Sequence, residues 1–110
     1  MIKYINIPEQ NKCIAVLPNT KYDAINKIAR VTGGTKSLCF DPSKYLMSDV
    51  YRAVVVCHPD DKYDEDLGMK IAKDKLMRKY YSALDAKIAE FVEDLNKAMF
   101  EASWRLTKNS

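Results

Sequence analysis

The long C-terminal segment of the chain constrains its fold more than any other feature. From Asp64 to about Leu106 the sequence contains no proline and a single glycine, Gly68, which is typical of one long helix. Within this segment, apolar residues recur in alternating steps of four and three, the repeat of a helix that packs along another helix. We call these eight positions the seam: Met77, Tyr81, Leu84, Ile88, Phe91, Leu95, Ala98 and Ala102.

The seam needs a cover. Burial of its large side chains, at about 1.5 to 3 kcal/mol each, is comparable with the whole stability of a small domain. An earlier apolar face points roughly 80° away from the seam, and its members are Met69, Ala72, Leu76 and Tyr80. The two halves of the helix therefore need different partners, and we expect the first half to pack on a sheet. The second half either folds back after a bend near residues 80–82 or pairs with its copy in a second chain, and we favour a homodimer or higher oligomer.

The first part of the chain predicts a hairpin and a short helix. Ile2–Ile7 and Lys12–Leu17 are short apolar runs separated by turn residues, which indicates a β-hairpin. The segment at about residues 20–32 has one apolar face, which indicates a helix. Thr20 and Asp23 at its start have a spacing similar to that of a capping box.

The middle of the chain predicts further short elements. Residues 37–40 have the composition of a strand, and the segment from Asp41 through Met47 indicates one helical turn. Tyr51–Cys57 is the clearest strand, because residues 53–56 are continuously apolar. Such a run indicates a central strand that is covered on both faces.

Together these elements predict the α+β class. We expect a small antiparallel sheet, one short helix and one long C-terminal helix, with or without a bend near residues 80–82. Residues 1–76 would form a small α+β domain, and residues 77–110 a helical extension of it for oligomerisation or interaction.

Composition limits the class of protein. A chain of 110 residues with 47% hydrophobic and 30% charged residues is typical of one globular domain. It has no apolar run near 18 residues and no charged-then-apolar leader, so we expect no membrane span and a cytoplasmic location. The cysteines Cys13, Cys39 and Cys57 lie in apolar runs and are odd in number, which indicates buried thiols rather than disulfides.

The net charge of +3 is mild and does not demand a nucleic-acid partner. The basic residues concentrate early in the long helix: Lys70, Lys73, Lys75, Arg78 and Lys79. Asp74 interrupts them, and at helical angles they scatter around more than half of the circumference. We therefore favour a solvated face, and contact with a nucleic acid or another partner remains the alternative.

The C-terminal end of the long helix remains apolar. Phe100, Trp104 and Leu106 either complete the seam or form an exposed anchor for a partner, and we favour the first. On the polar side, Glu93 precedes Lys97 by four positions, a spacing that adds a few tenths of a kcal/mol to a helix.

The chemistry-bearing residues do not form a catalytic set. Cys57 and His58 are neighbours on an extended strand, so their side chains point to opposite faces and cannot hydrogen-bond without a sharp turn. His58 with Asp60 and Asp61 offers an incomplete ligand set for a metal, and capping of the long helix by Asp61 or Asp64 is favoured. We expect no catalytic residues, no metal and no cofactor.

The junction between the last strand and the long helix carries a distinct pattern: Val55, Cys57, Asp61, Tyr63, Asp64, Gly68 and Ala72. This pattern, within residues 53–75, resembles the junction of small, mostly uncharacterised accessory proteins of phages that infect Gram-positive bacteria. The resemblance implies a phage or prophage accessory gene, with the protein in the host cytoplasm, and no particular activity.

These observations lead us to expect a non-enzymatic binding module. It would oligomerise through the C-terminal helix and bind a protein target, and inhibition of a host defence system such as a CRISPR nuclease is one member of this class. The alternative is a nucleic-acid-binding protein that uses the basic helix face from Lys70 to Lys79.

Overall fold

The computed structural model of the chain describes residues 1–32, 42–58 and 62–109, and the side chains of the last helix as far as residue 104. Its elements are β1 (Lys3–Ile7), η1 (Pro8–Gln10), β2 (Lys12–Pro18), α1 (Asp23–Thr32), η2 (Pro42–Tyr45), β3 (Val50–Val56) and α2 (Glu65–Asn109), where η denotes a 3-10 turn. The α+β class, with an antiparallel sheet, one short helix and one long C-terminal helix, is confirmed. The strand predicted at residues 37–40 lies outside the described residues.

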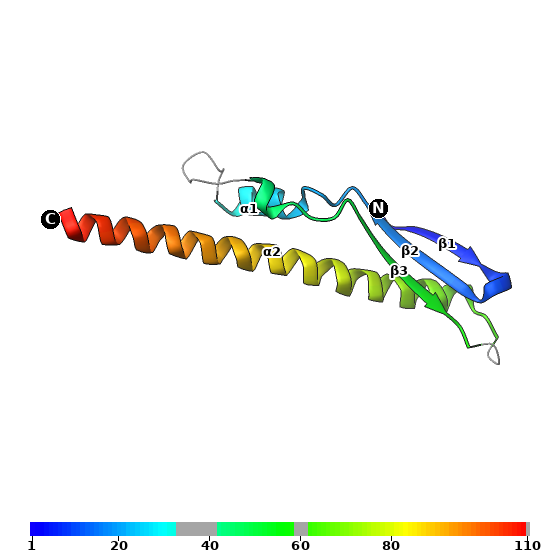
Figure 1. The fold of residues 1–110 in the computed structure, drawn as a ribbon. Helices are drawn as coiled ribbons and strands as arrows, with labels where there is room; N and C mark the ends of the chain where they lie inside the picture. Colours follow the sequence, from blue (N-terminus) through cyan, green and yellow to red (C-terminus); the bar gives the residue numbers. More distant parts are fainter. Residues whose placement is uncertain (33–41, 59–61, 110) are drawn as a thin grey trace.

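The molecule is elongated, with principal dimensions of 74 × 21 × 18 Å. Its radius of gyration is 20.4 Å, whereas a compact domain of this length has about 13 Å. Figure 1 shows that the sheet lies near the start of α2 and that α1 lies over the middle of α2. The C-terminal part of α2 extends past the sheet and past α1. Because α2 continues through residues 80–82 without interruption, the alternative in which the second half folds back is wrong.

The three strands form one antiparallel sheet in the order β1-β2-β3. β1 and β2 are the predicted hairpin, closed by η1 and by Asn11, whose left-handed backbone (φ 49°) is one that asparagine tolerates. Among the described strands, β3 lies at an edge of the sheet, paired with β2. The prediction that residues 53–56 belong to a central strand covered on both faces is wrong, because successive side chains alternate between the faces and only Ala53 is buried.

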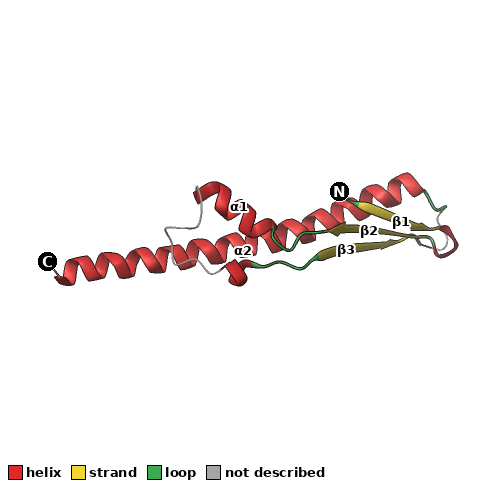
Figure 2. Ribbon diagram, turned by 90° about the horizontal axis from the view of Figure 1, so that it is seen from above, coloured by secondary structure: helices red, strands yellow, loops and turns green. Residues whose placement is uncertain are grey.

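Small residues on the inner face of the sheet bring α2 close to it. The contact is centred on five buried side chains: Cys13, Ala15, Ala53, Ala72 and Leu76. Four of these are alanine or cysteine, and such small side chains allow the helix backbone to approach the strands closely. Figure 2 shows the three strands and the start of α2 from above. The expectation that the first half of the long helix packs on the sheet is confirmed. Larger, partly buried residues surround the contact: Ile2, Tyr4, Leu17, Tyr51, Val55 and Met69.

Side chains fix the start of α2. Asp64 accepts a hydrogen bond from the Leu67 backbone N–H at 3.2 Å, which confirms aspartate capping of this helix. The Tyr63 hydroxyl lies 2.8 Å from Asn6 Oδ1 and 3.1 Å from the Lys12 carbonyl oxygen, and burial raises the pKa of Tyr63. These contacts attach the first turn of α2 to the hairpin.

The middle of α2 is covered by α1 and by the segment that contains η2. Leu84 and Phe91 of α2 are buried beneath four side chains from these elements: Ala24, Ile28, Tyr45 and Met47. The edge of the Tyr45 ring meets the Phe91 ring, with centroids 5.7 Å apart and planes at 86°. The predicted helical turn after Asp41 is observed as η2, and it supplies part of the cover.

The entry to α1 differs from the expected capping box. Thr20 is buried, its hydroxyl donates to the Ser48 carbonyl oxygen at 2.5 Å, and α1 begins only at Asp23. Thr20 therefore connects this entry to the segment before β3 instead of capping the helix. The Tyr80 hydroxyl donates to Asp23 Oδ2 at 2.6 Å, and burial together with this bond raises the pKa of Tyr80.

Replacing Leu76 tests whether the contact with the sheet anchors α2. Among the described residues, Leu76 is the largest fully buried side chain, and we expect Leu76→Ala to lower the free energy of unfolding by about 2 to 5 kcal/mol. The control is Leu67→Ala on the same helix, because Leu67 is 53% exposed, and we expect a change within about 0.5 kcal/mol. Urea unfolding followed by circular dichroism measures both, and equal effects would contradict the anchoring role.

Gly68 is buried at the contact with the sheet, but the contact does not require glycine. A Cβ atom there would lie 3.5 Å from the Cys13 Cβ and 3.6 Å from the Tyr63 Cε2, which are ordinary contact distances. We expect Gly68→Ala to raise the free energy of unfolding by up to about 1 kcal/mol, because alanine favours helix. A loss of stability in the same urea measurement would refute this account of the helix start.

Candidate interaction surfaces

The seam divides into buried, half-buried and exposed positions. Leu84 and Phe91 are only 4% and 7% exposed, because α1 and η2 cover them. The prediction that these two residues contact a second chain is therefore wrong. The helical period indicates that this face of the helix must be covered, but it does not indicate whether the same chain or a second chain covers it. Three other members of the seam are half-buried: Met77, Ile88 and Leu95. The remaining three are exposed: Tyr81, Ala98 and Ala102.

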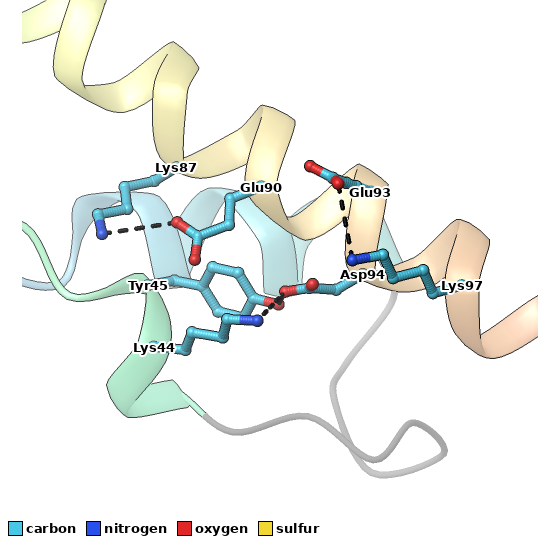
Figure 3. A network of polar contacts seen from close by, with 7 residues as sticks. All are labelled: Lys44, Tyr45, Lys87, Glu90, Glu93, Asp94 and Lys97. Atoms are coloured by element: carbon cyan, nitrogen blue, oxygen red, sulfur yellow. Dashed lines mark hydrogen bonds and ion pairs between the residues drawn. The ribbon is translucent and has the colours of Figure 1, made fainter.

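A polar contact holds η2 against α2 (Figure 3). Asp94 Oδ2 accepts a hydrogen bond from the Tyr45 hydroxyl at 2.5 Å and lies 2.8 Å from Lys44 Nζ. Lys44 first, and then Tyr45, lower the pKa of Asp94, and the same pairing raises the pKa of Lys44. Two further ion pairs run along α2 at 3.7 Å each, the second of which was predicted: Lys87 with Glu90, and Glu93 with Lys97.

An apolar groove of about 170 Å³ opens between α1 and α2. Val31 of α1 and Val92 of α2 are exposed at its sides, so the apolar lining reaches the surface. On the α1 side, the exposed Lys27 also lines the groove. The full lining is Lys27, Ile28, Val31, Ile88, Phe91, Val92 and Leu95.

The apolar surface continues along α2 beyond the groove. Val92, Leu95, Met99 and Ala102 follow one another in steps of three and four, so they lie on one side of the helix. We call these four residues the tail stripe. All side chains from residue 96 to residue 104 are exposed, including Met99 at 62%.

Phe100 and Trp104 form a separate exposed pair. They are 72% and 61% exposed and stand four positions apart, on the same side of α2 as each other. At 100° per residue they lie roughly 160° and 200° around the helix from Leu84. The favoured expectation that they complete the seam is therefore wrong, and the alternative, an exposed pair, describes them. The side chain of Leu106 lies outside the described residues.

The face of the sheet that points away from α2 was missed from the sequence. We call it the outer face, and the strand register arranges it in three rows: Lys3–Val16–Arg52, Ile5–Ile14–Val54 and Ile7–Lys12–Val56. Six of these nine residues are aliphatic, and Ile5, Val54 and Val56 are exposed. Antiparallel sheets that face water usually carry polar residues on that side. Apolar residues at successive positions of β3 and of the hairpin could have predicted this face, because successive side chains of a strand point to opposite faces of the sheet.

The basic residues early in α2 are all exposed: Lys70, Lys73, Lys75, Arg78 and Lys79. Lys79 Nζ donates to the Arg52 carbonyl oxygen at 3.4 Å, so one of them contacts β3. The others spread around the exposed part of the helix and do not form a single basic face.

The polar residues at the end of β3 border a hollow of about 240 Å³ between β3 and the start of α2. Cys57 and His58 line it together with Tyr63 and Asp64. The last two have structural roles, since Asp64 caps α2 and Tyr63 contacts the hairpin. Among the residues the structure describes, no three histidine, cysteine, aspartate or glutamate side chains gather as metal ligands would. Asp60 and Asp61, which were predicted together with His58 as candidate metal ligands, lie outside the described residues.

The junction pattern has a structural explanation in this chain. Asp64 is the cap of α2, and Tyr63 lies against Gly68 as well as the hairpin. Gly68 is buried near Cys13, and Ala72 is buried against the sheet. These four positions of the pattern therefore help to specify how the helix starts beside the sheet.

Comparison of the chain with protein-family models, with curated proteins and with solved structures finds no match. Within the described part of the chain, no helix has both the length and the apolar composition that crossing a membrane requires. The surfaces described above are therefore the basis for a functional proposal.

The contact between Asp94 and η2 predicts a pH dependence. Its folded-state pKa lies below the ordinary value of 3.8, so its contribution to stability is complete above that value and is lost as the pH falls through the folded-state pKa. We expect Asp94→Asn to reduce the free energy of unfolding at neutral pH and to match the wild type in strong acid. Urea unfolding from neutral to acidic pH measures the difference.

The matched control for this pH dependence is the neighbouring exposed carboxylate. Glu93 pairs with Lys97 at 3.7 Å, and both side chains are largely exposed, so Glu93→Gln should change stability little at any pH. A difference between wild type and Asp94→Asn that does not vary with pH would contradict the proposed ionic contact.

Proposed function

We propose that this protein is a non-enzymatic protein-binding module that forms a homodimer through the uncovered part of α2. The observation that carries the proposal is the tail stripe, which continues the apolar groove past the last residue covered by α1. Large apolar surfaces that remain exposed on a folded chain mark sites of association. The Phe100–Trp104 pair lies outside the stripe, and both side chains are exposed, so the pair is available to a target protein. Aromatic side chains dominate the energetics of many interfaces.

A second copy fits the groove and the stripe at once. Both surfaces lie on one side of α2 and share Val92 and Leu95. A two-fold axis near Leu95, with the two α2 helices antiparallel, would place Met99 of each copy beside the groove of the other, because Met99 and Phe91 are equally distant from Leu95 in sequence. Each copy would then cover the tail stripe of the other.

The phage setting and the role as an inhibitor of a host defence system rest on the junction resemblance and remain predictions. Binding of a target through an exposed surface is compatible with both. The five basic residues early in α2 do not form a single face, so nucleic-acid binding is not the function we propose.

Size-exclusion chromatography with light scattering tests the dimer. We expect the wild type to have twice the 12.6 kDa mass of one chain and the Val92→Asp/Met99→Asp variant to have the mass of a monomer, because each dimer would bury four added carboxylates. The control is Ala86→Asp/Ala89→Asp, which adds the same charge at exposed positions away from the stripe and should remain a dimer. A monomeric wild type, or a stripe variant that still dimerises, would refute the proposal.

A further inference from the structure

The outer face of the sheet has an unusual chemistry for a surface in water. None of the three strands contains an aspartate or glutamate. Its central row, Ile5–Ile14–Val54, is entirely aliphatic, and the rows on either side carry the cations. The outer face is therefore an aliphatic strip with positive charge at both ends and no carboxylate of its own.

The spacing of the cations matches the width of a helix. Lys3 on β1 and Arg52 on β3 stand opposite each other across Val16 of β2. Since neighbouring strands are about 4.8 Å apart, the two backbones are about 9.6 Å apart, close to the roughly 10 Å diameter of a helix. A helix lying along β2 would rest on Val16 and Ile14 with one cation on each flank.

The inner face of the same strands shows that this width suits a helix, because α2 occupies it. A second copy of the sheet fits the outer face poorly. Stacking two outer faces would bring together Lys3, Lys12 and Arg52 of both copies without any carboxylate from the strands. Like charges at an interface are unfavourable, so the occupant must bring negative charge.

We propose that the outer face binds an amphipathic helix of a target protein, one whose apolar stripe is flanked by aspartate or glutamate. The aliphatic row buries the stripe of the target helix, and Lys3 and Arg52 pair with its flanking carboxylates. The binding site is thus on the opposite side of the sheet from α2 and remote from the tail stripe, so dimerisation and target binding use separate surfaces.

A peptide titration tests this site in the full-length protein. The probe is a synthetic helical peptide with a leucine stripe flanked by glutamates, and amide shifts in nuclear magnetic resonance spectra report where it binds. We expect the shifts to centre on Ile5, Ile14 and Val54. The charge reversal Lys3→Glu/Arg52→Glu should weaken binding by about tenfold or more, while Lys73→Glu/Lys75→Glu, an equal charge change at exposed positions of α2, should not.

Three results would overturn the proposal: no shifts with the acidic peptide, equal affinity for a peptide in which lysines replace the glutamates, or shifts that centre on the groove and tail stripe. Binding only to vesicles of anionic phospholipid would also overturn it, since the outer face would then recognise a lipid surface. Urea unfolding of the Lys3→Glu/Arg52→Glu variant checks that it is folded. The Val92→Asp/Met99→Asp variant should bind the peptide as the wild type does, which separates this site from dimerisation.

Discussion

The uninterrupted course of α2 is the constraint on which the rest of the structure depends. The sheet covers one face of α2 near its start, and α1 with η2 covers a different face around Leu84 and Phe91. A helix of this length cannot be enclosed by a domain of 110 residues, because it is longer than the diameter of a small domain. The chain therefore forms an extended molecule with a radius of gyration of 20.4 Å, and the side chains of α2 from residue 96 to residue 104 are exposed.

The same constraint accounts for both candidate surfaces. A single long helix contributes one layer, and small residues such as Ala15 and Ala53 draw that layer close to the inner face of the sheet. The outer face receives no second layer from the described residues, although its residues are aliphatic. At the other end, α1 is too short to follow α2 past Leu95, so the tail stripe stays exposed. Each surface exists because the elements that the structure describes do not cover every apolar face.

The sequence predicted what depends on local periodicity. The hairpin, the long helix, the capping by Asp64 and the contact of the first half of α2 with the sheet followed from residue patterns and turn chemistry. What it could not predict depends on contacts between distant residues. Ala24 and Met47 cover Leu84, and Thr20 donates a hydrogen bond to Ser48. These residues are far apart in the sequence, and no residue pattern predicts that they come together. The outer face was not predicted, because a continuously apolar run such as residues 53–56 indicates a strand that is covered on both faces.

Amide hydrogen exchange along α2 tests the central claim most directly, at protein concentrations low enough to keep the chain monomeric. Amides from about Met69 to Leu95 should exchange slowly, since the sheet, α1 and η2 hold this part of the helix, and amides from residue 96 onward should exchange much faster. Fast exchange around residues 80–82 would contradict a continuous helix, and protection that continues undiminished to residue 109 would contradict an uncovered tail.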